Sequence, residues 1–175
     1  MTKARPLKLR AIDAEDLKVI SAALQDAIIP IGDMTYLSDE QCFALVANRF
    51  KWEDCDDIPL VPRDPAAGPL SDGDVRFAED APFERTNCGV CFSGITGVKC
   101  RGIDLHDRRQ FLLLLAVVEE NGRLFLHFAG DGCIRLETGN WSCRLEDIGD
   151  PWPTGLCPCH VTTDEPEPSQ RAQTA

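Results

Sequence analysis

Two clusters of cysteine residues lie far apart in the chain, and their types and spacing suit metal chemistry. The first is Cys88-Gly-Val-Cys91, and the second is Cys157-Pro-Cys159-His160. Thiolates are soft ligands, and four of them complete the closed tetrahedral site of a structural zinc ion. One interpretation is therefore a zinc site formed by Cys88, Cys91, Cys157 and Cys159, in which His160 could replace either sulfur of the second cluster.

Geometry limits this zinc interpretation. Residues three apart in a strand point to opposite faces, so Cys88 and Cys91 can share an ion only if Gly89 turns the chain. Cys157 and Cys159 are two apart, and in an extended segment they point the same way. Because the spacing departs from the usual paired Cys-x-x-Cys motifs, ordinary thiols are favoured and zinc remains the alternative.

The other roles open to cysteine are redox chemistry and simple packing. A redox pair of Cys88 and Cys91 would need a thiolate stabilised by a helix N-terminus or a nearby cation. Arg85 is the only basic residue close by, and no helical pattern follows Cys91, so thiol–disulfide chemistry is disfavoured. Cys42 and Cys143 fall among apolar residues expected to face the core, where a free cysteine packs as a small hydrophobe.

A short aromatic and basic segment, Asn48-Arg49-Phe50-Lys51-Trp52, could anchor a partner. Arginine and tryptophan are enriched among the residues that dominate binding energy. We select Asn48, Arg49 and Trp52 as candidate binding residues. The structural alternative is a strand that buries Phe50 and Trp52 and exposes Arg49 and Lys51.

A second candidate site is the charged segment 101–109, at the mouth of an expected hairpin. It contains His106 beside carboxylates, a combination that could act as a general base or bind a metal, although neighbours in a loop need not converge. We select Arg101 and Asp104 as candidate binding residues here. The alternative is an ordinary solvated turn.

No short catalytic motif accompanies these segments. The sequence contains no glycine-rich phosphate loop, no serine-nucleophile elbow and no paired metalloprotease histidines. We therefore assign no catalytic residue, and an enzyme would have to use a site that short motifs do not reveal.

Composition limits the cellular compartment and the classes of binding partner that we expect. The 175 residues suit one domain, and their net charge of -11 disfavours nucleic acid and anionic membranes as partners. No secretory signal and no apolar run of membrane-spanning length is recognisable, so we expect a cytoplasmic protein. Nine cysteines cannot all pair within one chain, which favours thiols over a disulfide scaffold.

The elements that must position these residues begin with a helix. Apolar steps of three and four residues predict a helix capped by Asp13 and stopped by Pro30. Strands over 31–37 and 42–47 should follow, joined by a polar turn. The proline-rich, acidic stretch 53–85 predicts a long loop.

The second half predicts an antiparallel meander. Asn121-Gly122 is a favoured type I′ turn, and it makes 111–118 a central strand covered on both faces. The resulting register pairs apolar residues: Val118 with Phe125, Val117 with Leu126 and Leu115 with Phe128. A loop over 130–132 should then align Phe128 with Ile134. Further strands are expected over 90–103, with bends at Gly94, Gly97 and Gly102, and around Trp141, Cys143 and Leu145.

Three stretches carry a resemblance to a known family: LKLRAIDAEDLKVISAALQDAI (7–28), NRFKWE (48–53) and VKCRGID (98–104). They resemble a family of short alphaproteobacterial proteins catalogued as domain of unknown function 2948, over most of residues 7–160. The resemblance implies a bacterial cytosol and carries over no activity, cofactor or catalytic residue. The cysteines at 88, 91, 157 and 159 are not part of the family's pattern, so a zinc site would be peculiar to this chain.

Taken together, the sequence predicts one α+β domain over 7–160 and a mobile acidic tail over 161–175. The domain is a mainly antiparallel β meander, a small barrel or sandwich of pleckstrin-homology-like type, with one N-terminal helix. The expected function is non-catalytic binding of a protein or small molecule without a cofactor. The alternatives are a zinc-stapled structural protein and an enzyme with an unrecognised site.

Overall fold

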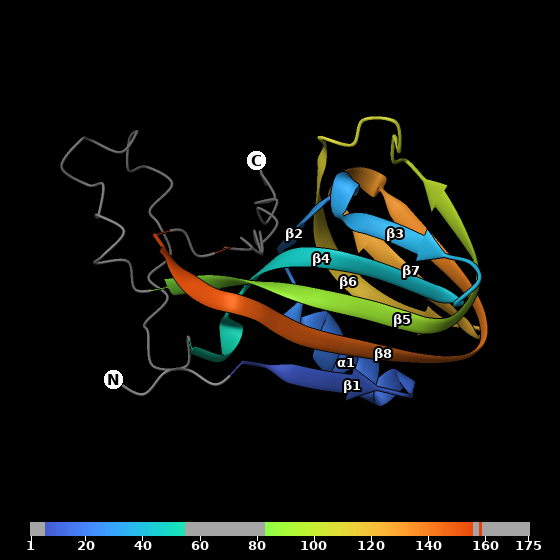
Figure 1. Cartoon of the computed structure of the whole chain (residues 1–175), viewed down its shortest axis with the longest axis horizontal. Helices are drawn as coiled ribbons and strands as arrows, with labels where there is room; N and C mark the ends of the chain where they lie inside the picture. Colours follow the sequence, from blue (N-terminus) through green and yellow to red (C-terminus); the bar gives the residue numbers. More distant parts are fainter. Residues whose placement is uncertain (1–5, 55–82, 156–157, 159–175) are drawn as a thin grey trace, which may run out of the picture.

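The computed structural model describes residues 6–54, 83–155 and 158. These residues form a mostly antiparallel sheet with one α-helix near the N-terminus (Figure 1), which confirms the predicted fold class. The predicted loop over 53–85 falls largely on residues outside the described part, and the predicted tail over 161–175 falls entirely outside it. In chain order the elements, with η marking 3-10 helices, are β1 (Lys8–Ala11), α1 (Ala14–Ala23), β2 (Ala27–Pro30), η1 (Ile31–Asp33), β3 (Met34–Leu37), β4 (Cys42–Phe50), η2 (Trp52–Asp54), β5 (Phe83–Arg101), β6 (Phe111–Glu120), β7 (Arg123–Phe128), η4 (Ala129–Asp131) and β8 (Cys133–Thr154).

Two long strands organise the sheet. The strand order is β1-β8-β5-β4-β2-β6-β7, with β3 added beside β4 and with β7 pairing a second time with β8. The strands β5 and β8 have 19 and 22 residues, and they pair along most of their length. Because β8 meets β1 near its middle and β7 near its start, the sheet curls around one core (Figure 1).

The helix α1 begins where the sequence predicts and ends earlier. Asp13 caps it by accepting a hydrogen bond from the Asp16 N–H at 2.9 Å. The predicted continuation to Pro30 is wrong, because Asp26 adopts a left-handed φ of 59° and the chain then enters β2. No helix in the described part of the chain is long and apolar enough to cross a membrane.

The core lies between the curled sheet and α1. Alternate residues of β4, β5 and β8 point inward, as the two-residue period of a strand requires. The helix adds the residues of its apolar stripe. Fully buried members from both layers include Leu17, Ile20, Leu24, Ile29, Phe92, Ile95, Leu114, Leu126, Leu136 and Leu145.

The hairpin of β6 and β7 confirms the predicted turn and part of its register. Asn121 and Gly122 have positive φ values, and Val118 lies opposite Phe125. The predicted pair of Leu115 and Phe128 is wrong, because a register shift between Leu114 and Ala116 brings Leu114 opposite Phe128 instead. Leu115 is therefore an extra residue in β6 relative to β7, an irregularity of the kind that bends a strand.

The prediction that β6 is covered on both faces is also wrong. One face is buried through Leu112, Leu114 and Val117, but Phe111 and Leu115 remain 66% and 41% exposed. Residues 111–118 are a continuous apolar run, which is typical of a strand buried on both sides. In this sheet no layer among the described residues covers the outer side of β6.

The connection into β8 slips relative to its predicted register. Residues 129–131 form η4 rather than a tight three-residue loop, so Ile134 lies opposite Leu126 and not opposite Phe128. A slip of two residues keeps every side chain on its predicted face, because the period of a strand is two.

Two of the predicted glycine bends are present, one at Gly94 in β5 and one at Gly102 just after it. Gly94 has a φ of 80° and Gly102 a φ of 68°, and register shifts with β8 flank Ile95 on both sides. A Cβ atom at Gly94 would lie 2.0 Å from the carbonyl oxygen of Asn140, so only glycine fits this bend.

Candidate functional site

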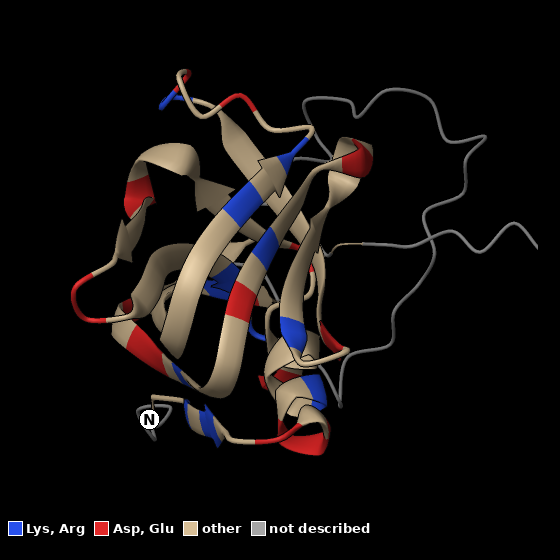
Figure 2. Cartoon of the chain, turned by 90° about the vertical axis from the view of Figure 1, so that its right-hand side faces the viewer, with Lys and Arg blue, Asp and Glu red and all other residues tan. Residues whose placement is uncertain are grey.

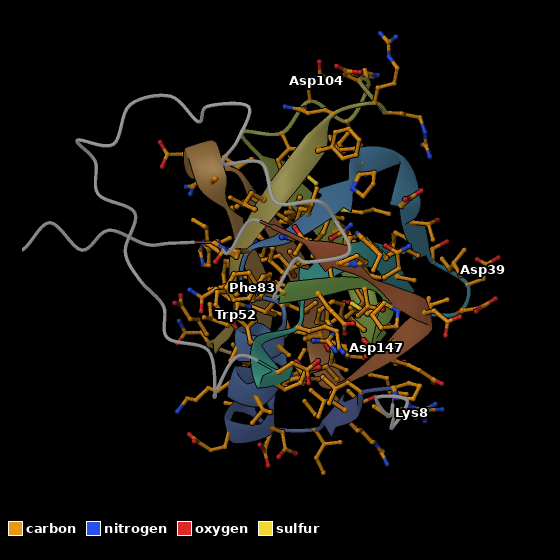
Figure 3. The ribbon with its side chains drawn as sticks, turned by 90° about the vertical axis from the view of Figure 1, so that its left-hand side faces the viewer. Lys8, Asp39, Trp52, Phe83, Asp104 and Asp147 are labelled. Atoms are coloured by element: carbon orange, nitrogen blue, oxygen red, sulfur yellow. The ribbon has the colours of Figure 1, made fainter. Side chains whose placement is uncertain are left out.

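An open pocket of about 610 Å³ lies where the loop after β5 leads into β6; we call it the mouth pocket. Its walls come from η1, β3, β4, β5, the loop and β8. The apolar lining residues are Ile31, Met34, Phe43, Val98, Ile103, Leu105 and Ile134, and the polar ones are Thr35, Tyr36, Cys100, Asp104, His106 and Arg108. Figure 3 places Asp104 at the end of the molecule opposite Lys8.

Backbone contacts fix the loop over the mouth pocket. It leaves β5 through Gly102, where a Cβ atom would come within 3.0 Å of the Asp131 carbonyl oxygen. It then docks on η1 through two reciprocal hydrogen bonds with Gly32. The Arg108 guanidinium donates to the Gly32 carbonyl at 2.9 Å, and the Gly32 N–H donates to the Arg108 carbonyl at 3.2 Å. The loop is therefore held by η1 at one end and by a glycine turn at the other.

The mouth pocket combines an apolar floor with a charged rim. Asp104 accepts a hydrogen bond from the His106 N–H at 2.9 Å, so its carboxylate shapes the turn as well as the rim. Figure 2 shows both signs of charge on this loop above the sheet. Arg108 and His106 place donors on the same rim. An arrangement of this kind suits an amphipathic ligand.

The thiol in the mouth pocket is poorly suited to nucleophilic catalysis. Burial raises the pKa of Cys100, and the nearby Cys133 raises it further. A thiol with a raised pKa is protonated at neutral pH, whereas the thiolate is the nucleophile. The Tyr36 hydroxyl is already occupied, because it donates to the Ile95 carbonyl at 3.1 Å.

Arg49, one of the predicted binding residues, lies inside the protein. Its side chain has no exposed surface, and its guanidinium contacts Asp147 at 2.7 Å and Glu53 at 2.7 Å. Burial alone would lower the pKa of Arg49, but hydrogen bonds to these two carboxylates outweigh it and raise the pKa. The expectation that Arg49 and Lys51 point outward is wrong, since both are buried.

Asn48 and Trp52 also make internal contacts. The Asn48 side-chain oxygen accepts a hydrogen bond from Arg85 at 2.5 Å, and the Trp52 indole N–H donates to the Gln25 carbonyl at 3.1 Å. The centroids of the Trp52 and Phe50 rings are 4.6 Å apart. These contacts join β4 to β5, and η2 to the turn after α1.

The structure does not unite the two groups of predicted binding residues. Figure 3 shows Trp52 well separated from Asp104, and Asn48 and Arg49 belong to the same region as Trp52. Asp104 lines the mouth pocket, whereas Arg101 is exposed and does not line it.

The first cysteine cluster remains in a regular strand. Gly89 pairs with Val46 on one side and with Glu146 on the other, so it does not turn the chain. Cys88 is buried in the core, and Cys91 lies on the opposite face of β5. The partner cysteines of the predicted zinc site, 157 and 159, lie outside the described residues. Within the described ranges, no group of three or more His, Cys, Asp or Glu side chains could hold a metal ion.

Cys143 packs in the core as expected, but Cys42 does not. Cys42 lies half-buried on the outer face of β4, where its Sγ is 2.7 Å from the Sγ of Cys91. Sequence reasoning missed this pair because it depends on the register between β4 and β5. A long intervening segment separates these strands, and no turn residue sets their register.

Comparison with known proteins places the chain in a family. A family model described as a protein of unknown function (DUF2948) matches residues 7–160. No curated protein and no solved structure matches the chain, so the likeness to pleckstrin-homology domains stays a prediction. The resemblance carried by residues 7–28, 48–53 and 98–104 is thus confirmed, and the chain belongs to the DUF2948 family.

Proposed function

We propose that this protein is a non-catalytic binding module, and that the mouth pocket holds a small amphipathic molecule with a singly charged anionic head. The observation that carries the proposal is an apolar floor beneath a loop whose Arg108 and His106 line the rim. The volume of about 610 Å³ falls within the range of small-molecule sites.

The floor sets the apolar half of the ligand. Phe43, Val98 and Ile134 line the mouth pocket from three neighbouring strands, β4, β5 and β8. Each buried methylene of a ligand contributes about 0.8 kcal/mol, and a chain or ring of modest size would therefore bind measurably.

The rim sets the polar half. Arg108 uses one amino group to hold Gly32, and its planar guanidinium has further N–H donors for an anion. Asp104 on the same rim repels heads of high negative charge. A carboxylate or sulfonate therefore fits better than a doubly charged phosphate.

Two features of the sequence support a cytoplasmic setting for this binding. Nine cysteines, an odd number, suit a reducing compartment. The net charge of -11 works against nucleic acid or an anionic membrane as the partner.

Two related probes test the proposal. Anilinonaphthalene sulfonate carries an aromatic body and one anionic group, and N-phenyl-1-naphthylamine is its neutral analogue. We expect the full-length protein to bind both in fluorescence titrations. Arg108→Ala should weaken binding of the sulfonate about tenfold, because a hydrogen bond to a charged group contributes about 1.5–3 kcal/mol. Binding of the neutral probe should change little.

Two further variants make this test decisive. Arg109→Ala removes the neighbouring cation, which is 97% exposed and does not line the mouth pocket, and should leave both affinities unchanged. Val98→Trp should fill the floor and weaken both probes. If Val98→Trp and Arg108→Ala proteins with native circular dichroism bind both probes like the parent, the mouth pocket is not the site.

A further inference from the structure

Cys42 and Cys91 are diagonal neighbours on the outer face of the sheet. In the ladder between β4 and β5, Cys42 lies opposite Ser93 and Ala44 lies opposite Cys91. Diagonal residues of antiparallel strands share one face and lie within reach of each other. The two Sγ atoms are 2.7 Å apart.

Both cysteines of the pair are partly exposed, unlike those in the core. Cys42 and Cys91 are half-buried, whereas Cys88 and Cys143 are fully buried. Cys91 also lines a second open pocket of about 440 Å³, together with Val46, Arg144 and Glu146 among others. A small oxidant can therefore approach Cys91 from solvent.

We propose that Cys42 and Cys91 form a reversible intramolecular disulfide between β4 and β5 when the protein meets a hydroperoxide, and that a small dithiol restores the two thiols. The site is independent of the mouth pocket and does not rest on its ligand. The redox chemistry belongs to two cysteines that come together only when β4 and β5 pair in the folded protein.

The order of reaction follows from the surroundings of Cys42. Burial raises the pKa of Cys42 to about 12, and the hydrogen bond with Cys91 adds to the effect. Cys42 is therefore protonated at neutral pH, and Cys91, which lines the second open pocket, is the sulfur that meets the oxidant first.

The atoms and electrons balance in two steps. The Cys91 thiolate attacks one peroxide oxygen, the O–O bond breaks, and the departing oxygen takes up a proton, leaving Cys91 as a sulfenic acid. The Cys42 sulfur then attacks the Cys91 sulfur, the S–O bond breaks, and water leaves with the proton of Cys42. Two thiols are oxidised to one disulfide, and one hydroperoxide is reduced to an alcohol and a water, or to two waters when the oxidant is hydrogen peroxide. Exchange with a dithiol reverses the result through a mixed disulfide.

Mass spectrometry of the full chain tests the pair. We use protein in which Cys157 and Cys159 are both replaced by serine, so that the second cysteine cluster cannot contribute. Treatment of the reduced protein with hydrogen peroxide should remove about 2 Da, the mass of two thiol hydrogens, and dithiothreitol should restore it. Peptide mapping without reduction should show Cys42 linked to Cys91.

Single substitutions assign the roles. Cys91→Ser should abolish the crosslink, and Cys42→Ser should leave a sulfenic acid on Cys91 that dimedone traps. Cys100→Ser removes a thiol at the mouth pocket instead and should form the crosslink like the parent. The proposal fails if peroxide does not lower the mass of the parent protein by about 2 Da, or if the crosslink maps to other cysteines. It also fails if the Cys42→Ser protein loses the same mass.

Discussion

Arg49 and Asp147 form a buried ion pair, with the Arg49 Nε 2.7 Å from the Asp147 Oδ1 and the Arg49 Nη2 2.8 Å from its Oδ2. Asp147 also accepts a hydrogen bond from the Leu7 N–H at 2.8 Å and donates its own N–H to the Leu7 carbonyl at 3.0 Å. One pair of side chains thus joins β4, β8 and the residue that precedes β1. The aromatic and basic segment that resembles a partner anchor in the sequence is an internal connection in the fold.

Removing one member of this pair should destabilise the protein strongly. Arg49→Met leaves the Asp147 carboxylate buried without its cation, which typically costs 3–5 kcal/mol, so we expect a loss of about that size. Urea unfolding followed by circular dichroism measures it. The double variant Arg49→Met with Asp147→Leu should lose less unfolding free energy than the two single variants lose in sum. A loss below about 1 kcal/mol for Arg49→Met would contradict the structural role.

The features that sequence reasoning predicted correctly are local ones. Asp13 caps α1 and Asn121 opens a hairpin because each acts within a few residues of itself. The helical pattern wrongly predicts helix over β2, because the strand conformation of β2 depends on its pairing with β6, far along the chain. The burial of Arg49 likewise depends on Asp147, 98 residues away.

In the candidate site, too, the local part is predictable from the sequence and the part built from distant strands is not. The charged loop was recognised because its composition is unusual over a few residues, and Asp104 does line the mouth pocket. The floor under it was not recognised, since Phe43, Val98 and Ile134 come from three strands whose registers the sequence does not specify. The proximity of Cys42 and Cys91 likewise depends on the register between β4 and β5, which the sequence does not specify.

Gly94→Ala should destabilise the protein by at least about 2 kcal/mol. The φ of 80° disfavours any L side chain, and the added Cβ would also meet the Asn140 carbonyl oxygen at 2.0 Å. Gly139→Ala is the matched control, because nothing lies within 4 Å of its added Cβ, and it should change the stability by no more than about 0.5 kcal/mol. Thermal unfolding of both variants measures the difference. Equal melting temperatures would show that the bend at Gly94 tolerates a side chain.

Stability should fall as pH rises above about 9, in part through Cys88. Burial raises the pKa of Cys88 to about 12, and the field of Asp147 raises it while that of Arg49 lowers it. A raised folded-state pKa gives full stability below the unfolded pKa, and this contribution is lost as pH rises toward the folded value. Between the two pKa values, each such thiol lowers the free energy of unfolding by about 1.4 kcal/mol per pH unit.

Urea unfolding of the parent and of Cys88→Ala between pH 7 and pH 10.5 isolates this contribution. The substitution should reduce the downward slope above about pH 9 by about 1.4 kcal/mol per pH unit. Below about pH 8 the two curves should run parallel, because the thiol is protonated in both states. Parallel curves throughout the range would show that Cys88 ionises normally in the folded protein.

Ser21→Ala should loosen the contact between α1 and β6. The Ser21 hydroxyl accepts a hydrogen bond from the Val117 N–H at 2.8 Å, just beyond the register shift in β6. Leaving a part-buried N–H without a partner costs about 1–3 kcal/mol. Hydrogen exchange of the Val117 amide should accelerate accordingly. Ser38→Ala, whose hydroxyl is exposed, serves as the control and should leave this exchange rate unchanged.

The pairing of β1 with β8 sets a condition on how the protein is made. Lys8 lies opposite Glu146, and Leu7 bonds with Asp147, so the first strand finds its partner only after most of the chain exists. At a synthesis rate of about 5–20 residues per second, this gap corresponds to roughly seven to thirty seconds on the ribosome. During that interval the nascent β1 has no native edge to join, and sheet assembly must finish after the last long strand has emerged.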